Sequence, residues 1–195
     1  MQPHNETEKE FLMTEEYIVR NCAPTLAGIK TASMFSCPCC EPEKLRNFLK
    51  DMNRRLNPKG IRLLPLKVSE KRALIYVYRP ERLSADICNT CAYKLLNDAG
   101  YDTRCCQRCL VNLINKLRYQ TEFPHEIGLF LGYPPEDVQG FILNKAQDYK
   151  LSGLWKVYGD VEDAKKRFEL FKKCDRIYFN QWSQGKDIEQ LTVAA

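Results

Sequence analysis

The chain has 195 residues, of which 44% are hydrophobic, and this length suits one compact domain over residues 1–195 with a core of its own. The net charge of +5 is mild, so charge alone does not assign the protein to a polyanion-binding class. No segment approaches the run of about 18 apolar residues that a membrane span needs. Residues 1–10 are polar and acidic, which predicts a disordered tail without a secretory signal, in a cytoplasmic protein.

Helix and strand signals divide the N-terminal part of the chain into helices followed by a hairpin. Apolar spacing, with Thr or Pro at helix starts, predicts helices over residues 6–19, 25–35 and 42–56, with a Cys-Pro-Cys-Cys loop at residues 37–40. Two β-rich runs, residues 61–68 and 73–79, are joined by a short polar turn and predict an antiparallel hairpin. Because Pro65 has no amide hydrogen, the first run is expected to be an edge strand or to contain a bulge.

The C-terminal part combines further helices with two more strand-like runs. Helices are predicted over residues 81–97, 104–119, 124–131 and 135–147, followed by a strand at 154–158, a helix at 161–173 and a strand at 176–182. A strand, a crossover helix and a second strand suggest a parallel pair that joins the hairpin. We therefore expect an α/β (α+β) fold with a four-stranded mixed sheet packed with helices.

Ten cysteines in a chain without an export signal favour reduced thiols, metal ligands or redox groups over a disulfide framework. Cys88-x-x-Cys91 and Cys106-x-x-Cys109 have the spacing of a zinc or iron–sulfur site, but both pairs fall within predicted helices. Cys88 and Cys106 would be offset along a helical hairpin by about 12 Å at a rise of about 1.5 Å per residue. Thiolates that share one zinc lie only about 4 Å apart. We therefore interpret these pairs as part of a packed core.

A second group of cysteines, Cys37, Cys39 and Cys40, lies in the predicted loop before a helix rich in Lys and Arg. The helix dipole and the positive charge both favour thiolate over thiol, and Cys22 precedes another helix start from which it could approach them. These four residues are the candidates for zinc or iron binding or for redox chemistry. A cysteine-rich loop without chemistry is the alternative, because no standard ligand spacing is matched.

Positive charge is concentrated between residues 44 and 72, where ten Lys and Arg residues accompany two acidic residues. Such a patch favours phosphates, nucleic acid or an acidic partner, and a solvated helix face is the alternative. Lys30 lies at a predicted helix start, whose free amides can hold a phosphate or carboxylate. The candidate ligand-binding surface consists of Lys30, Arg54, Arg55, Arg79 and His125.

One of the two histidines, His125, lies next to Glu126, directly after a proline that suits the first turn of a helix. The pair can serve acid–base chemistry, but no second histidine, nucleophile motif or spaced carboxylate set accompanies it, so bracing of the helices is the alternative. The same segment resembles a helix-turn-helix. DNA binding is not expected, because Glu136 and Asp137 stand where base-reading residues would be and repel phosphate.

Five separated segments, in order, resemble a bacterial family known only as a domain of unknown function, number 3793. They are residues 23–28 (APTLAG), 74–80 (LIYVYRP), 123–138 (FPHEIGLFLGYPPEDV), 155–160 (WKVYGD) and 191–194 (LTVA). The resemblance extends from about residue 16 to the end of the chain, and it implies no activity, cofactor or catalytic residue. We therefore expect an accessory protein that binds a small anionic ligand or a protein partner. The alternatives are a metal- or redox-active cysteine protein and an enzyme that uses His125 and Glu126.

Overall fold

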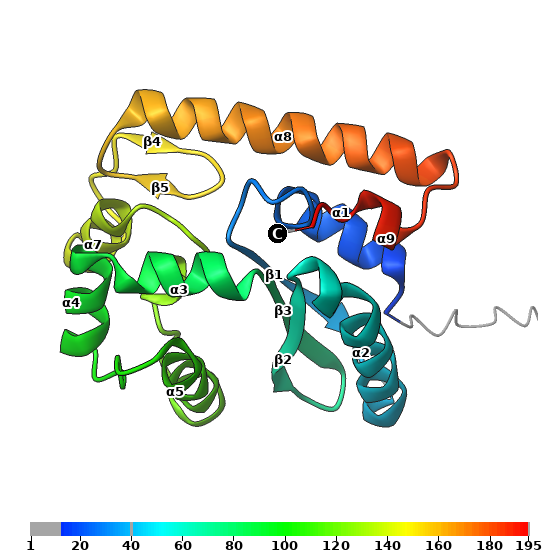
Figure 1. Ribbon diagram of the computed structural model, residues 1–195. Coiled ribbons are helices and arrows are strands. Elements are labelled where there is room, and N and C mark those ends of the chain that lie inside the picture. Colours follow the sequence, from blue (N-terminus) through cyan, green and yellow to red (C-terminus); the bar gives the residue numbers. More distant parts are fainter. Residues whose placement is uncertain (1–12, 40, 195) are drawn as a thin grey trace, which may run out of the picture.

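The computed structural model describes residues 13–39 and 41–194, so the expected tail over residues 1–10 lies outside the described residues. Helices surround a small central sheet (Figure 1). In chain order the elements are α1 (Glu15–Leu26), β1 (Ala32–Pro38), α2 (Pro42–Leu56), the 3-10 helix η1 (Asn57–Lys59), β2 (Arg62–Val68), β3 (Arg72–Tyr78), α3 (Pro80–Cys88), α4 (Thr90–Asp98), α5 (Cys106–Tyr119), α6 (Ile127–Phe130), α7 (Pro135–Leu143), β4 (Leu151–Ser152), β5 (Lys156–Val157), α8 (Val161–Ser183) and α9 (Ile188–Leu191). Within the described ranges, every helix is too short or too polar to cross a membrane.

The central sheet has three antiparallel strands in the order β1-β3-β2. The predicted hairpin is confirmed, because β2 pairs with β3 from Arg62 opposite Tyr78 to Val68 opposite Ala73. The register of β2 shifts between Pro65 and Lys67, so this edge strand carries a bulge where proline cannot donate a ladder hydrogen bond.

The predicted four-stranded mixed sheet is wrong. Strand β1 replaces much of the helix expected over residues 25–35 and pairs antiparallel with the other side of β3. Residues 176–182, expected to form a strand, belong to helix α8 instead. The apolar positions of α8 explain this, because Ala164, Phe168, Phe171 and Cys174 are buried at intervals of three and four residues. Strands β4 and β5 form a separate antiparallel pair, so the described residues contain no parallel pair.

Two further helix boundaries differ from the prediction. Helix α1 continues through Pro24 to Leu26, and Gly28, with a φ of 75°, lies in the turn that follows. Proline removes one helical hydrogen bond, but residues 22–26 are all buried, and we infer that their packing outweighs that loss. The helix predicted over residues 81–97 breaks at Asn89, whose side chain accepts hydrogen bonds from the first amides of α4.

Alternate side chains of β3 contribute to apolar clusters on opposite faces of the sheet. Ile75 and Val77 join the cluster formed with α1, α2 and α9. Tyr76 and Tyr78 join the cluster formed with α3, α4, α5 and the α6–α7 segment. Figure 1 shows the long helix α8 running beside α1, with its N-terminal end next to the β4–β5 hairpin. The fold therefore places helices on both faces of one central strand.

Tyr76 provides a direct test of this packing. Its side chain is fully buried, and its hydroxyl donates a hydrogen bond to the carbonyl oxygen of Phe130 at 2.5 Å. Tyr76→Phe should lower the free energy of unfolding by about 1–3 kcal/mol, because a buried carbonyl loses its partner. Urea denaturation measures the change. The control is Tyr119→Phe at a position that is 81% exposed, where no change is expected. Equal stability of Tyr76→Phe and the parent protein would contradict the packing described.

Candidate functional site

Arg79 joins three segments that are far apart in the sequence. It lies between β3 and α3, and only 3% of the residue is exposed. Its Nε donates to the carbonyl oxygen of Thr25 at 2.8 Å, and its Nη2 donates to those of Leu26 at 2.8 Å and Val193 at 2.7 Å. The carbonyl oxygens of Thr25 and Leu26 also accept from the amides of Gly28 and Val193, and a carbonyl oxygen can accept two hydrogen bonds. The end of α1 is the negative end of the helix dipole, so a cation stabilises it.

A cavity of about 500 Å³ opens beside Arg79, and we call it the arginine cavity. Its charged lining residues are Arg62, Arg79, Arg82 and Glu81, which gives three guanidinium groups and one carboxylate. Gly28 and Gly60 also line it, both with a φ of 75°, a conformation that favours glycine and leaves the backbone uncovered. The wall of the cavity is therefore positively charged and partly made of bare backbone.

The positive charge in the arginine cavity has no carboxylate partner among the described residues. Arg62, Arg79 and Arg82 take part in none of the ion pairs found there. The Nη1 of Arg79 has only a long contact, 3.5 Å, to the carbonyl oxygen of Lys59. Burial, and secondly the Arg82 guanidinium, lower the pKa of Arg79 below its ordinary value. Helix α3 begins at the cavity without a side-chain cap. Because Pro80 has no amide hydrogen, the amides of Glu81 and Arg82 are the donors that its first turn can offer.

The two arginines predicted on the basic helix form ion pairs within the chain. Arg55 is half-buried and binds Glu15 and Glu189, which joins α2 to α1 and α9 and raises the pKa of Arg55. Arg54 is exposed and pairs with Asp51 at 2.5 Å. Neither residue lines the arginine cavity.

Lys30 lies in the turn between α1 and β1, not at a helix start as predicted. Its amide donates to the carbonyl oxygen of Pro24 at 3.0 Å and is not free for a ligand. Its ammonium lies 5.6 Å from the ring of Tyr133 and 5.9 Å from the ring of Phe171. Burial lowers the pKa of Lys30, although the Cys22 thiol and the Asp175 carboxyl oppose this effect. Lys30 is thus held among aromatic rings, apart from the residues that line the arginine cavity.

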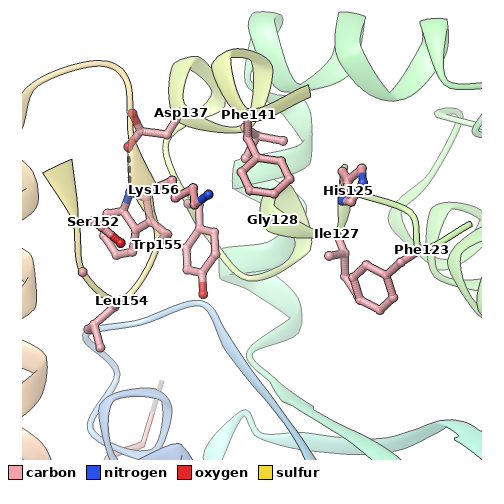
Figure 2. A pocket seen from close by; sticks show the side chains of 13 residues that line it. Phe123, His125, Ile127, Gly128, Asp137, Phe141, Ser152, Leu154, Trp155 and Lys156 are labelled. Atoms are coloured by element: carbon pink, nitrogen blue, oxygen red, sulfur yellow. Dashed lines mark hydrogen bonds between the residues drawn. The ribbon is translucent and has the colours of Figure 1, made fainter. Parts of the chain in front are cut away.

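His125 and Glu126 face different surroundings. His125 is exposed and lines a second cavity, where its ring lies 5.1 Å from that of Phe141 (Figure 2). Glu126 is 8% exposed and accepts hydrogen bonds from the Tyr101 hydroxyl at 3.0 Å and from the Lys116 ammonium at 3.1 Å. The carboxylate of Glu126 therefore connects the segment before α6 to Tyr101 and to Lys116 of α5. Among the described residues, no hydrogen bond joins it to His125.

The loop cysteines are buried, contrary to the expectation of exposed thiolates. Cys22 and Cys37 are fully buried, Cys37 within strand β1, and Cys39 is 4% exposed, whereas Cys40 lies outside the described residues. Burial raises the pKa of the Cys22 and Cys37 thiols, which favours the protonated form. Across residues 13–39 and 41–194, no three His, Cys, Asp or Glu side chains are grouped to hold a metal ion.

The helical cysteines follow the core interpretation only in part. Cys109 is buried, and burial raises its pKa to about 11. Cys88 and Cys91 are exposed, and Asn89 separates the helices that carry them. The core interpretation of Cys88 and Cys91 assumed that both lie on one continuous helix, and the structure does not contain that helix.

These exposures predict an order of alkylation. In a brief iodoacetamide pulse on the native protein, the exposed residues Cys88, Cys91 and Cys105 should react before the buried Cys22 and Cys37, because reaction needs an accessible thiolate. Peptide mapping by mass spectrometry gives the order directly. Earlier labelling of Cys22 or Cys37 would contradict the burial described.

The fold is that of an α+β protein with a cavity lined by three arginines. A family model described as a protein of unknown function (DUF3793) matches residues 18–192, and the chain belongs to this family. No curated protein and no solved structure matches the chain. Three of the five segments that carry the family resemblance, residues 23–28, 74–80 and 191–194, meet at the hydrogen bonds of Arg79.

The other two segments, residues 123–138 and 155–160, meet at Asp137. The carboxylate of Asp137 accepts hydrogen bonds from the indole Nε1 of Trp155 and from the amides of Tyr158 and Gly159, each at 2.7 Å. Sequence reasoning named Arg79 but missed Arg62 and Arg82 as its neighbours. For Arg82 the one signal was its position, three residues after Arg79 in the first turn of the helix that Pro80 begins. Arg62 comes near Arg79 only through the pairing of β2 with β3.

Substitution of Arg79 tests its structural role. Arg79→Met should lower the free energy of unfolding by about 2–5 kcal/mol, because the carbonyl oxygens of Thr25, Leu26 and Val193 each lose a hydrogen bond, and the bonds to Thr25 and Leu26 are buried. Arg82→Gln, at an exposed position in the same cavity, should change stability by no more than about 0.5 kcal/mol. Urea denaturation of both variants provides the comparison, and similar stabilities would contradict the structural role of Arg79.

Proposed function

We propose that this protein binds a small phosphorylated molecule in the arginine cavity. The observation that carries the proposal is Arg79, a buried guanidinium whose charge meets only carbonyl oxygens. A buried charge without an opposite charge is costly, and a bound anion would supply the missing partner.

Phosphate suits the cavity better than a single carboxylate. Arg62, Arg79 and Arg82 come from β2, the β3–α3 junction and α3, so they can reach an anion from several directions. A guanidinium group can bind two oxygens of one phosphate at the same time, and the amides of Glu81 and Arg82 at the uncapped start of α3 are available for a third oxygen. The volume of about 500 Å³ lies in the range of small-molecule sites and leaves room for an organic group beside the phosphate.

The lining favours binding over catalysis. Among the lining residues that the structure describes, Glu81 is the only carboxylate, and there is no histidine, cysteine, serine or lysine. Acid–base and nucleophilic catalysis need such groups at the substrate. The protein is thus proposed as an accessory binding protein. Free thiols at nine described cysteines support a reducing compartment such as the cytoplasm.

Thermal denaturation with defined probes tests the proposal. Inorganic phosphate, AMP and glucose 6-phosphate are added separately at about 10 mM, and at least one should raise the melting temperature, because a ligand that binds only the native state stabilises it. The shift should shrink as salt is added, since salt screens exposed charges over about 10 Å at 0.1 M. The double variant Arg62→Gln/Arg82→Gln should lose the shift while its melting temperature without ligand stays near that of the parent protein.

Arg54→Gln is the matched control, because Arg54 is an exposed arginine on the basic helix and does not line the cavity. This variant should keep the full shift. The proposal is wrong if none of the three probes stabilises the parent protein, or if the double variant responds as the parent does. Loss of the shift in Arg54→Gln would place anion binding on the surface of α2.

A further inference from the structure

A second cavity, of about 390 Å³, lies between the α6–α7 segment and the β4–β5 hairpin. It shares no lining residue with the arginine cavity. Figure 2 shows Trp155 and Leu154 on the hairpin side, Phe123 and His125 on the opposite side, and Phe141 between them. We call it the aromatic cavity.

Five of the described aromatic side chains line the aromatic cavity, namely Phe123, His125, Tyr133, Phe141 and Trp155. The His125 ring lies 6.4 Å from the ring of Phe123 and 5.1 Å from that of Phe141, so these three form a row. On the hairpin side, Trp155 stacks on Tyr133 at 4.8 Å with an interplanar angle of 25°. Aromatic rings attract other aromatic rings in offset or edge-to-face contact, so these walls favour a planar ligand.

The walls are fixed by contacts outside the cavity. Asp137 holds the indole of Trp155 and the backbone that follows β5 through its three hydrogen bonds. Gly128 and Gly153 line the cavity, and a Cβ on either would lie within 3 Å of a neighbouring side chain, Val138 or Phe168. The site is therefore closely packed before a ligand arrives, which lowers the ordering cost of binding.

The charge of the aromatic cavity selects the kind of ligand. The Asp137 carboxylate already accepts three hydrogen bonds, so it has little capacity left for a ligand. The Lys156 ammonium donates to the carbonyl oxygen of Ala146 at 2.7 Å and forms no ion pair with a carboxylate among the described residues. It lies 5.9 Å from the ring centroid of Phe141, which lines the cavity, and 4.6 Å from that of Tyr149, which does not. An ammonium group has three N–H donors, so its hydrogen bond to Ala146 leaves donors for a ligand.

We propose that the aromatic cavity binds a planar aromatic carboxylate, with its ring between the side chains of Phe141 and Trp155 and its carboxylate on Lys156. The site is independent of the arginine cavity, and failure of one proposal leaves the other intact.

Three small probes separate the parts of this proposal. 2-Naphthoate carries both the aromatic rings and the negative charge, 2-naphthamide keeps the rings without the charge, and cyclohexanecarboxylate keeps the charge without an aromatic ring. The readout is the indole N–H signal of Trp155 in the ¹⁵N-labelled protein, assigned with the variant Trp182→Phe, which removes the other tryptophan. 2-Naphthoate should shift this signal saturably, and it should bind about tenfold more tightly than either other probe.

Lys156→Met should weaken 2-naphthoate binding about tenfold, as expected for loss of a hydrogen bond between charged groups, and leave 2-naphthamide binding unchanged. Lys150→Met is the matched control, because Lys150 also donates to one carbonyl oxygen, that of Gly159, but does not line the cavity. That variant should bind 2-naphthoate as the parent protein does.

Several results would overturn the proposal. These are no saturable shift with 2-naphthoate, equal binding of all three probes, or unchanged 2-naphthoate affinity in Lys156→Met. A shift of the Trp155 signal with protein concentration alone would assign the cavity to a second copy of the chain and would also overturn the proposal.

Discussion

The structure depends on one buried guanidinium. Arg79 donates to carbonyl oxygens of Thr25, Leu26 and Val193, and thereby holds the end of α1 and the C-terminal segment against the corner between β3 and α3. Val193 reinforces this junction, because its amide donates to the carbonyl oxygen of Leu26 at 3.0 Å. No apolar side chain could replace Arg79, because a guanidinium supplies several donors in a fixed planar arrangement and here reaches three carbonyl oxygens at once.

The same contact links the stability of the fold to the anion binding that we propose. Carbonyl oxygens satisfy the hydrogen bonds of Arg79 but leave its positive charge in place, beside Arg62 and Arg82 at an open cavity. The fold thus retains a charge that an apolar core would not need, and an anion is the simplest group to balance it. Asp137 has a comparable structural role where residues 123–138 meet residues 155–160, because its hydrogen bonds fix the hairpin that carries Trp155 and Lys156. The five family segments therefore form two junctions, each beside a cavity.

The sequence predicted correctly those helices and strands that are determined by neighbouring residues in the chain. The β2–β3 hairpin, its bulge at Pro65 and helix α2 followed from turn residues, missing amides and apolar spacing. Helix α1 continued through Pro24, and β1 formed where a helix was expected, because burial and pairing with β3 outweighed local preference. The candidate site, too, depends on tertiary contacts that local sequence patterns do not reveal. Arg79 could be named from the sequence, but its carbonyl partners come from segments 53 to 114 residues away, and the burial of Cys37 and Cys39 depends on tertiary packing.

The most direct test of the central claim is to locate a bound anion. Crystals of the protein soaked in tungstate, a heavy oxyanion similar in shape to phosphate, give an anomalous difference map that shows where the anion sits. The account predicts a strong peak within hydrogen-bonding distance of the Arg79 and Arg82 guanidinium groups in the parent protein, and its loss in crystals of Arg62→Gln/Arg82→Gln. Peaks confined to the exposed basic surface of α2, or an empty arginine cavity in crystals that bind tungstate elsewhere, would contradict it.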